Sequence, residues 1–185
     1  VGGADKVLEN CIVEQVYFPD YEGDGKQYRQ FAEALDASSA ERIPVTGRIE
    51  IKMGDASVGI LASALEPEEI LAGGEEEYDN DLSLAVRLVY GEDTMLFLGD
   101  AKEQRIEELL TSGEDLSCDI LKMPHHGRYH NGLPELLEAA HPDDAVICCS
   151  DKNPAEEETL ALLKEQGITA WETQDGNIEI SGRGE

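Results

Sequence analysis

Residues 96–100, with the sequence LFLGD, form an apolar run that ends in glycine and aspartate. Residues 120–127, ILKMPHHG, show the same pattern, with two histidines and a glycine after the apolar run. Runs of this kind are typical of buried strands, which deliver the residues that follow them to the rim of a sheet. Carboxylates and imidazoles at such a rim can bind metal or move protons. The two stretches therefore predict an active site where two neighbouring strands end.

The composition is that of a soluble, strongly acidic chain. Its 185 residues fit one domain with a substantial core, and 41% of them are apolar, with no unbroken apolar run of membrane length. We interpret the net charge of −27 as a solvated acidic surface, because no block of five or six like charges is present. This charge disfavours direct nucleic-acid binding, which depends mostly on Lys and Arg. An anionic substrate would need a local metal ion or basic patch.

The cysteines and the start of the chain carry little functional signal. Cys11, Cys118, Cys148 and Cys149 show no CxxC spacing, so we expect free, buried cysteines rather than a metal or disulfide framework. The first residues show neither the basic nor the apolar region of a signal peptide.

Apolar periodicity predicts hairpins in the first half of the chain and alternating strands and helices in the second. Helices are predicted within residues 2–10, 25–35, 101–110, 133–140 and 154–166. Strands are predicted over residues 11–18, 49–53, 58–61, 82–90, 95–98, 118–123, 145–149 and 168–171, the last forming a terminal hairpin with 177–180. Residues 66–78 are expected to be a surface loop. This order predicts a layered α/β sandwich in a single domain, since no long linker divides the chain.

Asp100 has two interpretations. It follows a buried strand and precedes a predicted helix, so it could simply cap the helix that begins at Ala101. Alternatively, it is a site carboxylate whose burial is compensated by a cation or by hydrogen bonds.

The tandem histidines favour the site interpretation. His125 and His126 precede Gly127, which lets the loop approach a ligand closely. One histidine at a strand end is often a satisfied core residue, but two in succession rarely are. His130 and His141 carry less signal, and His141 stands at a predicted helix end, where capping is the default.

Three segments together resemble the metallo-β-lactamase superfamily: residues 80–88 (NDLSLAVRL), 96–100 and 119–127 (DILKMPHHG). The resemblance is greatest to the ComEC-like competence proteins and the related phosphorylcholine esterases. Residues 1–4 (VGGA) resemble the end of the family signature HxHxDHxGG, where a variable residue and two glycines come after the final histidine. The resemblance implies an αββα sandwich, an α/β (α+β) fold, over residues 1–185. It also implies that this domain lacks its N-terminal strands and the HxHxDH motif.

The resemblance implies a hydrolytic metal centre. Such proteins usually bind two divalent metal ions, commonly zinc or manganese, that activate water for hydrolysis. Asp100 would be a metal ligand that bridges the two ions, and His125 and His126 would line the site as catalytic residues, His125 also as a metal ligand. Asn80, in the first matching segment, is a further candidate site residue.

One element departs from the family pattern. Relatives commonly carry a Gly-His-Pro element where this chain reads SDKNP, residues 150–154. Asp151 is therefore either a substitute oxygen ligand or a plain helix-start residue.

We expect this chain to be a portion of a metal-dependent hydrolase that cleaves phosphodiesters in its full-length form. Alternatives are a non-catalytic scaffold of the same fold, and a hydrolase of a small choline-like or thioester substrate, which an acidic protein would attract if cationic. An intact HxHxDH motif upstream of Val1 would favour the enzyme. By itself the chain is expected to bind metal weakly or not at all and to be inactive, and its uncovered sheet would favour self-association. A ComEC-like protein would be extracellular or membrane-associated, and otherwise cytoplasmic.

Overall fold

The computed structural model describes residues 2–23, 25–66 and 78–182, and the chain divides into two compact units, Val1–Thr46 and Gly47–Glu185. The first unit contains α1 (Ala4–Asn10), β1 (Gln15–Pro19), α2 (Lys26–Ala37) and β2 (Glu41–Val45). Its two strands pair in parallel, and α2 buries Phe31 and Leu35. The helices agree with the sequence prediction, whereas β1 begins four residues later than the predicted strand.

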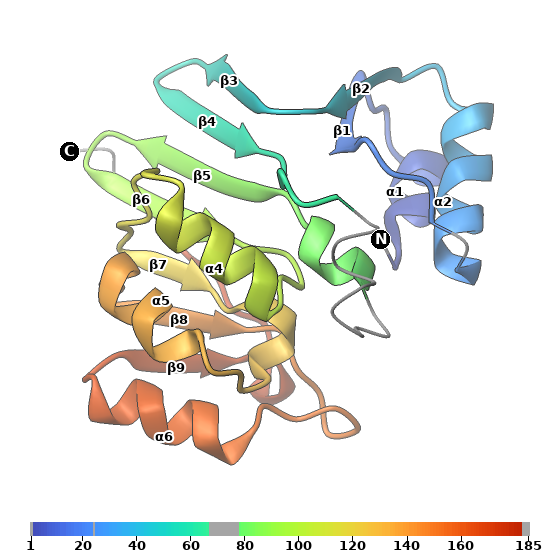
Figure 1. The fold of residues 1–185 in the computed structure, drawn as a ribbon. Helices are drawn as coiled ribbons and strands as arrows, with labels where there is room; N and C mark the ends of the chain where they lie inside the picture. The colour runs from blue at the N-terminus through green and yellow to red at the C-terminus, as the bar shows by residue number, and fades with distance from the viewer. Residues whose placement is uncertain (1, 24, 67–77, 183–185) are drawn as a thin grey trace. The chain divides into compact units, whose positions relative to one another are not determined.

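The second unit is built on a seven-stranded sheet in the order β3-β4-β5-β6-β7-β8-β9 (Figure 1). The strands are β3 (Arg48–Met53), β4 (Ala56–Leu61), β5 (Ala85–Tyr90), β6 (Asp93–Phe97), β7 (Ile120–Lys122), β8 (Asp144–Ile147) and β9 (Thr169–Glu172). Strands β3 to β6 pair antiparallel, and β6 to β9 pair in parallel. This is the predicted order of hairpins followed by alternating strands and helices.

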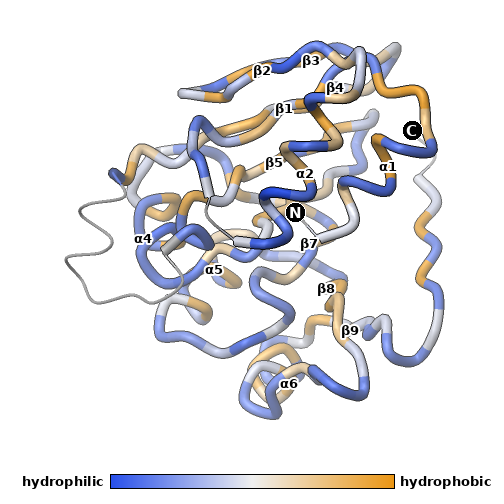
Figure 2. Tube along the Cα trace, turned by 90° about the vertical axis from the view of Figure 1, so that its right-hand side faces the viewer, coloured by the Kyte–Doolittle hydropathy of each residue, from blue (hydrophilic) through white to orange (hydrophobic). Residues whose placement is uncertain are grey.

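Three helices connect the parallel strands and lie on the same side of the sheet (Figure 1). They are α4 (Glu103–Thr111), α5 (Leu133–Ala140) and α6 (Glu157–Glu165). A strand-helix-strand crossover between parallel neighbours is almost always right-handed, so successive helices cover the same face. Figure 2 shows hydrophobic residues along β8 and residues of both kinds along α6, as expected for a helix with one buried face.

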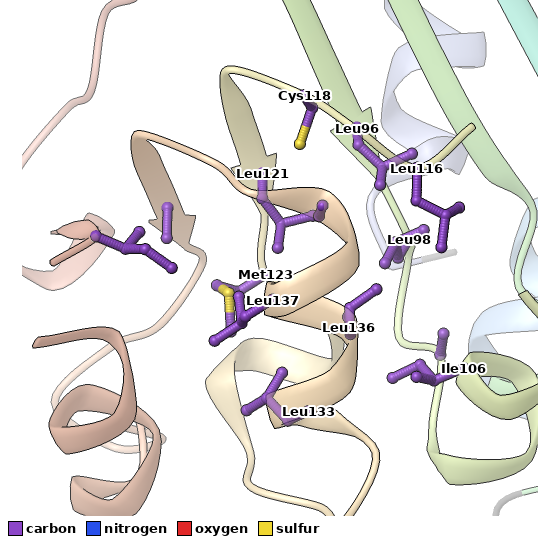
Figure 3. Packing of buried hydrophobic residues seen from close by; sticks show 14 of the residues in the cluster. Leu96, Leu98, Ile106, Leu116, Cys118, Leu121, Met123, Leu133, Leu136 and Leu137 are labelled. Carbon is purple, nitrogen blue, oxygen red and sulfur yellow. The ribbon is translucent and has the colours of Figure 1, made fainter. Parts of the chain in front are cut away.

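The main core lies between this sheet face and the helices. Leu121 and Met123 lie beside Leu137 of α5, and all three are at most 1% exposed (Figure 3). Ile106 of α4 and Leu133 of α5 are fully buried in the same cluster. This packing fixes the ends of the strands from which the candidate site residues extend.

The predicted terminal hairpin is wrong. Strand β9 pairs in parallel with β8, and residues 177–180 do not form a strand. The crossover through α6 brings β9 back beside β8, and alternation in sequence cannot reveal which strand becomes the partner. The surface loop predicted for residues 66–78 lies almost wholly outside the described residues.

The cysteine prediction is half right. All four cysteines are free, but only Cys118 is buried, and burial raises the pKa of its thiol to about 12. Cys11 and Cys148 are exposed and Cys149 is half-buried. The cause is that β8 ends at Ile147, so Cys148 and Cys149 belong to the loop after the strand rather than to its apolar run.

Within the described residues, no helix is both long and apolar enough to cross a membrane.

Candidate metal site

Strands β6 and β7 run in parallel, so the residues that follow them meet at one edge of the sheet (Figure 1). Asp100 follows β6 and His126 follows β7. The Oδ2 atom of Asp100 lies 3.6 Å from Nε2 of His126, and both side chains are about two-fifths exposed, at 41% and 39%. The structure thus brings together two of the candidate site residues identified from the sequence, at a position that is open to solvent and to a ligand.

Asp100 is held in this position by its backbone. Gly99 has φ of 58°, and a Cβ added there would lie 2.9 Å from the side chain of Ser83, so glycine is required on both grounds. The backbone N–H of Asp100 donates to the Ser83 hydroxyl at 3.2 Å. Ser83 therefore supports the site, a role that sequence analysis missed.

Asp100 does not cap the following helix. The first helical residue of α4 is Glu103, and the carboxylate at its N-terminus is that of Asp81, whose Oδ1 accepts from the backbone N–H groups of Lys102 (2.9 Å) and Arg105 (3.0 Å). A side chain from a distant part of the sequence thus satisfies the helix end. The capping interpretation of Asp100 is wrong, and its carboxylate faces His126 and Lys122 instead.

Lys122 is a second residue that sequence analysis missed. Its Nζ donates to the Gly99 carbonyl at 2.7 Å and lies 3.7 Å from Oδ1 of Asp100. The available signal was a lysine inside a short apolar strand, where a charged group needs a partner.

The histidine loop has an unusual backbone. His125 (φ 43°, ψ 47°) and His126 (φ 58°, ψ 23°) are both left-handed, a conformation that L-residues other than glycine adopt at a cost of about 1–2 kcal/mol each. Gly127 follows with φ of 75°, and a Cβ there would lie 2.9 Å from Ile147. Strain of this kind persists where surrounding contacts impose it and is concentrated at functional sites.

A backbone carbonyl orients His126. Its Nδ1 lies 2.7 Å from the carbonyl oxygen of Cys148, which follows β8. Because a carbonyl only accepts hydrogen bonds, Nδ1 is the donor, and in the neutral form of the ring the lone pair is therefore on Nε2. This is the arrangement by which proteins aim a histidine at a metal.

The Asp100–His126 pair has the chemistry and spacing of two ligands to one ion. Oxygen and nitrogen ligands about 2.0–2.2 Å from a tetrahedral ion lie roughly 3–4 Å from one another. The observed 3.6 Å separation falls within that span. Among the described residues, however, no group of three or more His, Cys, Asp or Glu side chains is arranged to hold an ion. The pair therefore fits part of a metal centre.

The other candidate residues are His125, Asn80 and Asp151. The His125 and His126 ring centroids are 6.3 Å apart, so the two imidazoles do not share one position. Asn80 lies in the 3-10 helix Tyr78–Leu82, and Asp151 is exposed in the turn after β8. Within the described part of the chain, no hydrogen bond or ion pair connects either of these two residues to Asp100 or His126.

The remaining histidines differ in environment. His141 is the C-cap of α5, in the left-handed conformation, as the capping interpretation implied. His130 lies on the loop between the tandem histidines and α5, and burial lowers its pKa, with Glu103 opposing this shift and His125 adding to it.

Comparison with known proteins supports the sequence resemblance. The chain is 23% identical over 186 aligned residues to the ComE operon protein 3 of Bacillus subtilis (strain 168), covering 97% of this chain and 23% of that protein. The chain thus spans about a quarter of the length of this relative. No family model matches the chain.

Among solved structures, CmlA from Streptomyces venezuelae, a diiron β-hydroxylase with the metallo-β-lactamase fold, superposes with a TM-score of 0.51 at 14% identity. The match covers 90% of this chain and 39% of that one. A variant of CmlA aligns at 13% identity with a TM-score of 0.48, over 85% of this chain and 38% of the other. The superposition on CmlA itself shows that the chain has the metallo-β-lactamase fold, and with the similarity to the ComE operon protein 3 it confirms the resemblance to that superfamily.

Proposed function

We propose that this chain is part of a metal-dependent hydrolase of the metallo-β-lactamase superfamily that cleaves phosphodiesters in its full-length form. Asp100 and His126 would hold a divalent metal ion such as zinc or manganese. The observation that carries the proposal is the carboxylate of Asp100, which does not cap a helix and lies 3.6 Å from Nε2 of His126, a histidine oriented by the Cys148 carbonyl.

The residues of the chain have separate tasks in this proposal. A bound divalent ion would act as a Lewis acid on the scissile phosphoryl group. The backbone N–H of Asp100 is held by the Ser83 hydroxyl, which places Asp100 at the end of its strand, and the Cys148 carbonyl orients the His126 ring. His125, whose ring lies apart from that of His126, would contact the substrate phosphate and stabilise its charge.

A phosphodiester is favoured as substrate by the resemblance of the sequence to the ComEC-like competence proteins and the phosphorylcholine esterases, although the chain spans only about a quarter of the similar ComE operon protein 3. The net charge of −27 would repel long polyanions, so direct binding to nucleic acid would require further basic surface. A small phosphodiester needs only the local positive charge of the metal.

The test is hydrolysis of bis-p-nitrophenyl phosphate by the full-length protein with manganese or zinc. We expect Asp100→Ala and His126→Ala to lower kcat/KM by at least about a hundredfold, the scale for removing a group that stabilises charge in the transition state. Asp143→Asn and His141→Asn make comparable changes away from these strand ends and should leave the rate unchanged. Wild-type rates in both site variants would refute the assignment, and a full-length protein that binds metal without turnover would indicate a scaffold.

A further inference from the structure

Lys122 connects the two halves of the candidate site. Its Nζ donates to the Gly99 carbonyl at 2.7 Å, and the backbone N–H of His125 donates to the same oxygen at 3.3 Å. One carbonyl therefore receives a side chain from β7 and a backbone group from the histidine loop. Lys122 stands in register between Phe97 of β6 and Val146 of β8, and its side chain is only 17% exposed.

Two different groups face the two oxygens of the Asp100 carboxylate. Oδ1 lies 3.7 Å from the Lys122 ammonium, and Oδ2 lies 3.6 Å from Nε2 of His126. A carboxylate is planar, so an attraction that holds one oxygen also sets the direction of the other. The ammonium is itself restrained by its shorter bond to Gly99, which makes it a fixed point rather than a mobile counter-ion.

We propose that Lys122 is a positioning residue that fixes the Asp100 carboxylate so that Oδ2 points toward His126 and a divalent ion. The metal-binding part of this inference rests on the proposed function. Lys122 acts through Gly99 and Asp100 and does not contact the ion or the substrate. The ammonium of Lys122 can be half-buried here because it contacts the Gly99 carbonyl and the Asp100 carboxylate.

If Lys122 acted only through its charge, removing it would change metal affinity in the opposite direction from that expected of a positioning residue. An ammonium near a metal ion repels it, so a lysine that only contributed charge would weaken metal binding, and its removal would strengthen it. If Lys122 positions the carboxylate, its removal weakens binding, because the ligand oxygen is no longer held in place.

The experiment compares Lys122→Met, which removes the ammonium, with Lys122→Arg, which keeps a charged donor. Lys164→Met makes the same change as the first variant at an exposed position of α6. The first readout is the imidazole ¹⁵N–¹H spectrum of the metal-free chain, which contains four histidines. We expect the His126 signals to shift in Lys122→Met and in Asp100→Asn, to shift less in Lys122→Arg, and to stay in place in Lys164→Met.

The second readout is cobalt binding to the full-length protein, followed by the visible absorption of the ion. We expect Lys122→Met to weaken cobalt affinity about tenfold, the scale for residues that orient metal ligands, and to alter the spectrum. Lys122→Arg should retain part of the cobalt affinity and part of the wild-type spectrum. Unchanged or tighter binding with an unaltered spectrum in Lys122→Met would overturn positioning.

The two readouts separate this inference from the proposed function. Unshifted His126 signals in Lys122→Met overturn the positioning role whether or not metal binds. If these signals shift but wild-type protein binds cobalt no better than Asp100→Asn, positioning stands and the metal-dependent function fails. A thermal midpoint that falls by about 2–8 °C in Lys122→Met with unshifted His126 signals would assign Lys122 a structural role only.

Discussion

The loops that follow β7 and β8 leave the same edge of the sheet, but they differ in how their backbones are built. The β7 loop holds two left-handed histidines and a glycine that has no room for a side chain. The β8 loop closes on itself, with Ser150 and Asn153 exchanging backbone hydrogen bonds, and leaves Asp151 exposed. It contributes a backbone carbonyl, that of Cys148, to the site. Of these two loops, the left-handed residues belong to the one that carries the candidate site histidines.

The largest loss of stability is expected from a substitution at Gly127 in the β7 loop. Gly127→Ala should lower the free energy of unfolding by about 1–2 kcal/mol for the left-handed conformation and by a further 1–3 kcal/mol for the collision with Ile147. Gly167→Ala is the matched control, because Gly167 has the same φ of 75° but open space around it. Urea denaturation of both variants measures the difference. Equal losses would mean that the loop is not closely packed.

Asp81, at the start of α4, and Asp100, after β6, should contribute differently to the free energy of unfolding. Asp81→Ala should cost about 1–3 kcal/mol, because two backbone N–H groups at the start of α4 lose their acceptor. Asp100→Ala should cost less than about 1 kcal/mol, since its partners are a partly exposed lysine and histidine. Thermal unfolding of the two variants gives the comparison. A larger loss in Asp100→Ala would reinstate a structural role for that carboxylate.

A third change relieves the strain of the histidine loop. His125→Gly should be more stable than His125→Ala by about 1 kcal/mol, because glycine adopts the left-handed conformation without steric cost. Both variants lack the imidazole and should be equally impaired in hydrolysis by the full-length protein. Chemical denaturation measures the first quantity. If alanine proved as stable as glycine, the left-handed conformation would not be imposed by the fold.

The smallest effect is expected in the β8 loop. Asp151→Ala should change stability by no more than about 0.5 kcal/mol, as is usual for exposed positions. It should also leave metal affinity unchanged, since the described structure connects Asp151 to neither Asp100 nor His126. Calorimetric metal titration of the full-length protein tests this. A tenfold loss of affinity would show that the β8 loop supplies an oxygen ligand.

Much of the fold was predictable because its signals are local. The apolar runs ending at Gly99 and Met123 predicted β6 and β7 to within a few residues, and helix α5 was predicted with its observed bounds. Pairing was not local: β9 lies beside β8 because of a crossover, and nothing in residues 177–180 reveals that they form no strand.

The residues of the candidate site could be recognised in the sequence only in part, because contacts between distant elements are not visible there. Asp100 and His126 stand out because each follows a buried strand. Asp81, Ser83 and Lys122 act through contacts between elements, such as the bond from Lys122 to Gly99, which spans 23 residues of sequence. The sequence did not reveal that Asp81 caps α4, because Asp100 directly precedes the predicted helix and was the expected capping residue.

The role of Asp100 and His126 as metal ligands is tested most directly by locating a metal ion in crystals of the full-length protein grown with manganese or zinc. Anomalous diffraction at the absorption edge locates the ion independently of any assumed ligand. We expect a peak within bonding distance of both Asp100 Oδ2 and His126 Nε2, and loss of that peak in Asp100→Asn. An ion bound elsewhere, with Asp100 and His126 outside its coordination sphere, would contradict this role.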